Sequence, residues 1–289
     1  MTAAHCIPDD IRDITVVEGE HNLTDNVLGD VVKIKENVIH PLYMNSENDK
    51  DFDIALTFLE RPTTMANVRL VHLNMDNSYP PDNTIATYLG WGMVNTIGEV
   101  SSILREVDVA VMTNEECNLV SGTIYNIYFS LSGMVTPSMM CTFTKGKDSC
   151  QRDSGGPLIV RGKDASRDIQ IGVSSWGVSC ASDTFPGVVS RVSYSWQFIR
   201  ENVCNKSSIP PDYFECSTIG EPLAPSSSKP SSSLSPSIKL TSESVEQIPS
   251  ASPIPSSNAQ KSISNIIVAL LAMSICLFLL CQSLTALLI

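Results

Sequence analysis

Ser154 has the sequence setting of a nucleophile, because it stands in the run DSGGP. A serine hydroxyl reacts slowly until a base takes its proton and a third group orients that base. Two other short motifs offer those groups: TAAHC contains His5, and DIAL begins with Asp53 on a predicted buried strand. Together the three residues could cleave an acyl bond, with His5 as general base and then acid, Asp53 orienting the imidazole, and Ser154 forming an acyl-enzyme.

Short apolar or alternating runs, broken by turn residues, must position these groups. Such runs occupy residues 31–34, 53–59 and 169–173. Strands of this length and spacing predict an all-β barrel or sandwich. One helix is predicted at residues 195–203, where apolar side chains recur at helical spacing.

Cysteine usage and charge limit the compartment and the partners. Seven of the nine cysteines lie in the first 216 residues, spaced like stapled loops, which predicts an oxidising compartment. Sequons for N-glycosylation begin at Asn22 and Asn205. The net charge of −12 argues against a nucleic-acid partner. No cluster has metal-ligand spacing, so neither a metal nor a cofactor is expected.

The composition changes sharply towards the C-terminus. Residues 221–260 hold 14 Ser and 7 Pro, which predicts a disordered stalk. Residues 266–289 form an uncharged apolar run, long enough for a membrane helix of about 20 residues. The small residues at 256–259 and a short polar spacer before this run favour a GPI-anchor signal over a retained membrane span. Either reading tethers the protein to a membrane.

The order His, Asp, Ser, with the motifs GWG at 90–92, SWG at 175–177 and PGV at 186–188, resembles the chymotrypsin/trypsin family of serine proteases from residue 2 to about 205. The resemblance implies an all-β fold of two Greek-key antiparallel β-barrels with a short C-terminal helix. We divide the chain accordingly into the remainder of the first barrel (1–79), the second barrel and helix (80–205), a Cys-containing extension (206–220), the stalk (221–260) and the hydrophobic tail (261–289).

The same resemblance implies the remaining site residues. The backbone N–H groups of Arg152 and Ser154 would form the oxyanion hole. Asp148 would lie at the base of the primary pocket, where a carboxylate in an apolar slot favours a substrate Lys or Arg. The substrate-binding residues implied are Asp148, Ser175, Trp176, Gly177 and Gly187.

Disulfide pairing also follows from the resemblance. It implies the bonds Cys117–Cys141 and Cys150–Cys180. Cys204 and Cys216 are left over, and we expect them to pair locally, with a bond to a missing N-terminal piece as the alternative.

Two residues and the start of the sequence depart from the family pattern. Arg152 replaces a glycine of the oxyanion hole; its N–H survives, but its side chain is expected to narrow the cleft and to reduce sensitivity to bulky protein inhibitors. Val189 replaces a tyrosine that usually supports the pocket floor. The sequence begins at the histidine motif, without the free Ile or Val terminus that pairs with the residue equivalent to Asp153. We therefore expect Met1 to be an internal methionine of a truncated gene model, and the chain as written to fall short of a competent protease.

These features predict a membrane-tethered extracellular endopeptidase that cleaves protein or peptide substrates after Lys or Arg and binds serine-protease inhibitors. The alternative is a catalytically silent homologue that acts as a binding or adaptor protein. Arg152 and the missing N-terminus favour the alternative, whereas the intact triad favours the enzyme.

Overall fold

A computed structural model of the chain describes residues 1–218 apart from 13, 26–28, 44–49, 66–67 and 96–97. The predicted stalk and membrane anchor lie outside these described residues. Within them, no helix combines the length and the apolar character needed to cross a membrane.

The N-terminal part of the chain forms a three-stranded antiparallel sheet from β1 (Thr15–Glu18), β2 (Asp30–Ile39) and β3 (Ala55–Leu59), in that order. Along the first half of β2, buried Val32 and Ile34 alternate with exposed lysines, the pattern of a strand with one face in a core. An isolated bridge joins Thr2 to Ala55 at the start of β3. This bridge brings the short 3-10 helix η1 (Ala4–Cys6), which carries His5, beside that strand.

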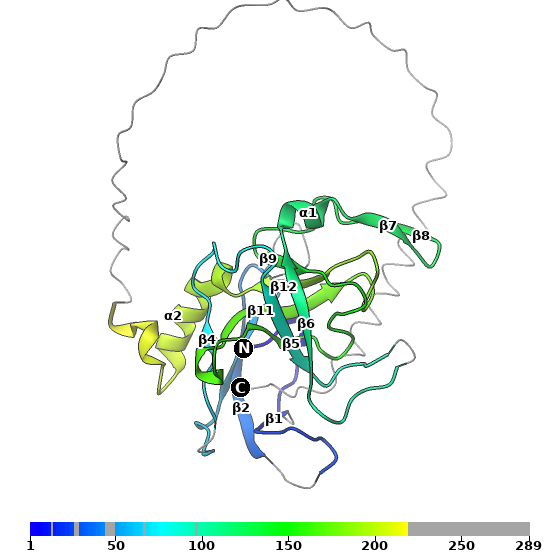
Figure 1. The fold of residues 1–289 in the computed structure, drawn as a ribbon. Helices are drawn as coiled ribbons and strands as arrows, with labels where there is room; N and C mark the ends of the chain where they lie inside the picture. The colour runs from blue at the N-terminus through cyan, green and yellow to red at the C-terminus, as the bar shows by residue number, and fades with distance from the viewer. Residues whose placement is uncertain (13, 26–28, 44–49, 66–67, 96–97, 219–289) are drawn as a thin grey trace, which may run out of the picture. The chain divides into compact units, whose positions relative to one another are not determined.

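Six further strands close into an antiparallel barrel (Figure 1). Their order around the barrel is β5, β6, β9, β12, β11 and β10, and pairing of β10 with β5 closes it. Successive strands of the barrel are therefore paired neighbours except β9 and β10, between which the chain makes a Greek-key crossing. The strands are β5 (Ile85–Gly90), β6 (Arg105–Met112), β9 (Met139–Thr142), β10 (Pro157–Val160), β11 (Ile169–Gly177) and β12 (Gly187–Arg191). The predicted all-β class is confirmed.

Shorter elements surround the barrel. A two-residue strand, β4 (His72–Leu73), pairs in parallel with β11, and β7 (Ser121–Ile124) pairs with β8 (Ile127–Ser130) as a hairpin. The remaining short helices are η2 (Ala165–Arg167), η3 (Ser193–Ser195), η4 (Asp212–Phe214) and η5 (Cys216–Thr218).

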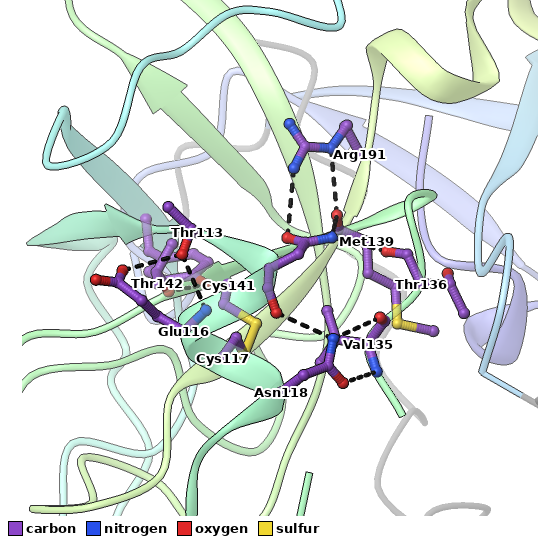
Figure 2. Close-up of a disulfide and its surroundings, with 12 residues drawn as sticks. Thr113, Glu116, Cys117, Asn118, Val135, Thr136, Met139, Cys141, Thr142 and Arg191 are labelled. Carbon is purple, nitrogen blue, oxygen red and sulfur yellow. Dashed lines mark hydrogen bonds between the residues drawn. A yellow bond between two sulfur atoms is a disulfide. The ribbon is translucent and has the colours of Figure 1, made fainter. Parts of the chain in front are cut away.

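The five-residue helix α1 (Asn114–Asn118) shows how local sequence anchors a connection (Figure 2). Thr113 accepts a hydrogen bond from the Glu116 backbone N–H and so caps the helix. The Cys117–Cys141 disulfide then fastens α1 to β9. Asn118 exchanges two hydrogen bonds with the Val135 backbone, which holds the following loop.

The C-terminal helix α2 spans Trp196–Lys206, slightly beyond the predicted range of 195–203. Ile199 is its buried residue and belongs to one core cluster with Ile54, Val173 and Phe214. Disulfides join Cys204 to Cys216 and Cys150 to Cys180, so all three expected pairs are present. The segment after α2 is thereby held against the helix.

Candidate active site

The carboxylate of Asp53 is the most fully bonded group of the candidate site. Its Oδ1 accepts the backbone N–H of His5 at 2.9 Å, and its Oδ2 lies 2.6 Å from Nδ1 of the same residue. The Ser175 hydroxyl donates a third bond to Oδ2 at 2.5 Å. Because an ionised carboxylate only accepts, Nδ1 must carry the proton, and Nε2 of a neutral His5 is left as a base.

The backbone around Asp53 is fixed by its neighbours. Phe52 adopts a left-handed conformation with φ 53°, and its ring stacks on His40 with centroids 4.6 Å apart. The Ser190 hydroxyl donates to the Asp53 carbonyl oxygen at 2.7 Å. Burial lowers the pKa of His40 to about 4, so at neutral pH His40 is an uncharged packing partner.

Ser154 stands in a turn that packs against the segment carrying His5. Within the turn, the Gly156 N–H donates to the Asp153 carbonyl at 2.9 Å, and the Gly155 N–H donates to Ser174 on β11 at 2.8 Å. Gly155 has φ 81°, and a β-carbon there would overlap the Thr2 hydroxyl and lie 3.3 Å from the Ala3 nitrogen. Only glycine allows this approach, which brings the turn of Ser154 against the chain segment that carries His5.

Arg152 has φ 76° in the same loop, although left-handed backbone is costly for a residue with a β-carbon. Its side chain is exposed. The strain explains why a glycine suits this position in the family pattern. No sequence rule would have predicted that arginine adopts the same backbone angle.

Asp153 is held by backbone donors on both oxygens. Gly92 N–H donates to its Oδ1 at 2.8 Å and Cys150 N–H to its Oδ2 at 2.9 Å. A β-carbon at Gly90 or Gly92 would overlap this carboxylate, which gives a physical reason for both glycines of the GWG motif. Burial raises the pKa of Asp153, and it has no ion-pair partner among the described residues.

Two of the expected pocket residues, Gly177 and Gly187, lie on neighbouring strands beside Asp148. Gly177 pairs with Gly187 across β11 and β12, and a β-carbon on Gly187 would overlap Oδ1 of Asp148. Backbone N–H groups of Ser149 and Ala181 bond to the carboxylate, but its buried Oδ1 has no partner among the described residues. Burial raises the pKa of Asp148 to about 7. A buried carboxylate oxygen without a bonded donor suits a cationic partner.

Trp176 precedes Gly177 on β11 and pairs with Val188 of β12. The Nζ atom of Lys50 lies 5.8 Å from the centroid of its indole ring. The Cys150–Cys180 disulfide connects the loop that follows Asp148 to the loop between β11 and β12.

Sequence reasoning missed several hydroxyl groups. Ser175 was predicted as a substrate-binding residue, and the bond of its side chain to Asp53 was not predicted. Ser174 lies 3.1 Å, oxygen to oxygen, from Ser149 beside Asp148. Tyr88 on β5 bonds to Thr142 on β9 within the buried interior. Only the strand register brings these residues together, so a single sequence carries no signal for them.

Among the described residues, no His, Cys, Asp or Glu cluster is arranged for a metal ion.

Comparison with known proteins identifies the family. A family model described as Trypsin matches residues 1–199. A trypsin from Saccharopolyspora erythraea is 34% identical over 207 residues, covering 70% of this chain and 82% of the relative. A venom serine protease from Polistes dominula is 34% identical over 206 residues (69% and 70%), and a vitellin-degrading protease from Bombyx mori is 34% identical over 212 residues (71% and 72%). The chain therefore belongs to the trypsin family of serine proteases.

Proposed function

We propose that this protein is a serine endopeptidase that cleaves after Lys or Arg, with Ser154 as nucleophile, His5 as general base and Asp53 as the partner of His5. The family membership supports the reaction class. The single observation that carries the specificity is the buried Oδ1 of Asp148, which has no partner among the described residues.

The reaction would proceed through an acyl-enzyme. Ser154 Oγ attacks the carbonyl carbon of the scissile bond while its proton passes to His5 Nε2, and the carbonyl oxygen becomes an oxyanion held by the N–H groups of Arg152 and Ser154. His5 then gives the proton to the leaving nitrogen, and the C–N bond breaks. Water attacks the ester in the same manner, and the proton returns to Ser154 Oγ as the acid product leaves.

The pocket chemistry favours a long cationic side chain. An uncompensated buried carboxylate is costly, so a ligand that brings a cation to Asp148 gains more than a neutral ligand of similar size. The glycines on the two walls leave room for the aliphatic part of Lys or Arg. Val189 has no hydroxyl, so other groups of the pocket floor must set the relative preference for Arg and Lys.

The proposed location is the extracellular surface. Three disulfides within the described residues support an oxidising compartment. Asn205, a proposed glycosylation site, is exposed on the last turn of α2, and the other proposed site, Asn22, is partly exposed. The GPI anchor proposed for the tail stays a prediction, as does membrane tethering.

A silent homologue that binds proteins without cleaving them is the second candidate. The observation that favours it is Arg152, which stands where the family pattern has the glycine of the oxyanion hole and has φ 76°. In the family pattern, a free N-terminus released by cleavage pairs with the residue equivalent to Asp153 and shapes the oxyanion hole. We propose that Asp153 accepts such an ammonium group when the protein is active.

Peptide amides that differ only at the residue before the scissile bond test the proposal. We expect cleavage after Arg and Lys and none after Phe or Ala. Replacing Asp148→Ser should lower kcat/KM for Arg and Lys about 10²–10³-fold, because a buried charge pair is lost. Ser154→Ala is the control and should abolish turnover. A folded wild-type protein that cleaves none of these amides would contradict the enzyme and favour the adaptor.

The raised pKa of Asp148 predicts pH-dependent binding of benzamidine, which stays cationic over the range. Below about pH 7 the carboxyl of the free protein is protonated, so affinity should fall about tenfold per pH unit, and above pH 7 it should level off. Calorimetry between about pH 5.5 and 8.5 measures this. The Asp148→Asn variant should bind weakly at every pH; an equally steep pH dependence in that variant would assign the titration to another group.

Two replacements of Arg152 separate backbone strain from crowding. Arg152→Gly should be more stable than Arg152→Ala by about 1 kcal/mol, because only glycine relieves the left-handed conformation. Both variants remove the guanidinium, so both should bind a bulky protein inhibitor more tightly than the wild type. Thermal unfolding and inhibition titrations measure the two effects. Unchanged inhibitor affinity in both variants would refute the crowding hypothesis.

A further inference from the structure

The interior of the closed barrel contains a tyrosine whose hydroxyl reaches the floor of the candidate pocket. Tyr88, on β5, is 3% exposed. Its hydroxyl lies 2.9 Å from Oγ1 of Thr142, the last residue of β9. Burial is the main cause that raises the pKa of Tyr88, and the Asp148 carboxylate adds to the rise. Tyr88 therefore keeps its proton at neutral pH and brings no second negative charge to the pocket.

Thr142 connects this tyrosine to Asp148. Thr142 pairs with Gly187 across β9 and β12. A β-carbon on Gly187 would lie 3.4 Å from Thr142 Oγ1 and would overlap Asp148 Oδ1. Thr142 Oγ1 and Asp148 Oδ1 thus both lie beside Gly187. The Tyr88 hydroxyl bonds to this threonine oxygen and is therefore one hydrogen bond away from the glycine.

A second route runs through Ser149. The Ser149 hydroxyl is a second polar neighbour of the Tyr88 hydroxyl and lowers the phenol pKa in opposition to burial. The same hydroxyl lies 3.1 Å from Oγ of Ser174 on β11. A group of hydroxyls therefore lies near the Asp148 carboxylate. They come from β5, β9, β11 and the loop of Asp148 itself.

Tyr88 and Val189 both face the same part of the barrel interior. Both residues belong to the same core cluster, and both lie against Leu158. Tyr88 is opposite Leu158 in the pairing of β5 with β10, while a β-carbon on Gly172 would overlap Val189 and lie 3.5 Å from Leu158. A valine on β12 leaves the interior volume that a large side chain from β5 can occupy.

We propose that Tyr88 is a positioning residue of the pocket floor, supplying from β5 the hydroxyl lost through Val189 on β12, and that it orients Thr142 and Ser149 to accept hydrogen bonds from a substrate Lys. This inference rests on the proposed function. A compact ammonium has three donors and needs acceptors besides the carboxylate, whereas a planar guanidinium can engage Asp148 with two parallel bonds. The floor hydroxyls therefore matter more for Lys than for Arg.

The test compares kcat/KM for matched Lys and Arg amides in the wild type and in Tyr88→Phe, which removes only the hydroxyl. We expect the Lys-to-Arg ratio to fall roughly tenfold, the effect of about one hydrogen bond to a charged group. Thr142→Val should lower the ratio in the same direction. Tyr79→Phe is the matched control, since Tyr79 packs against the same core cluster, and its ratio should not change.

The exchange variant Tyr88→Val/Val189→Tyr gives the sharpest result, because it should restore the ratio by returning a tyrosine to β12. Equal losses for Lys and Arg in both Tyr88→Phe and Thr142→Val, or an unchanged ratio in these folded variants, would overturn the inference. Failure of the wild type to cleave either amide would instead contradict the proposed function. Thermal unfolding of each variant identifies those that fold, and Thr142→Val keeps the test decisive if the exchange variant does not.

Discussion

The hydrogen bonds of the Asp53 carboxylate are the constraint on which the candidate site depends. They join three parts of the chain that are far apart in sequence: the turn of η1, the segment just before β3, and β11 of the barrel. Removing a carboxylate from water is costly, and the three donors offset this cost. The same bonds fix the proton on Nδ1 of His5. The contacts that hold the site together therefore also set the tautomer that its base requires.

Three aspartates illustrate how environment assigns roles to one residue type. Asp53 has three donors, one of them an imidazole. Asp153 accepts one backbone N–H group on each oxygen and shapes the loop that carries Ser154. Asp148 keeps one buried oxygen without a described partner, and its pKa is raised to about 7. Asp53 therefore suits orientation of a base, Asp153 suits maintenance of the loop structure, and Asp148 suits binding of a cation.

Much of this arrangement was predictable from sequence because it depends on local motifs. Runs of alternating residues indicated the strands, apolar spacing indicated α2, and the family resemblance indicated the disulfides and candidate site residues. The contacts of Tyr88, Ser175 and Ser190 were not predictable, because they follow from strand register and barrel closure between residues far apart in sequence. The left-handed backbone of Phe52 and Arg152 was also missed, since neither residue type signals it. The helix α2 ends three residues later than predicted, at Lys206, because the predicted range followed apolar spacing alone and the last turn is largely polar.

The most direct test of the account is the labelling of Ser154 by a fluorophosphonate, which reacts with a serine only when a base activates it. Peptide mapping should place the label on Ser154 in the wild type. The Asp53→Asn variant should react more slowly, by up to about 10⁴-fold, because the imidazole loses its orienting carboxylate. Labelling at an equal rate in that variant, or no labelling of folded wild-type protein, would contradict the claim that His5 and Asp53 activate Ser154.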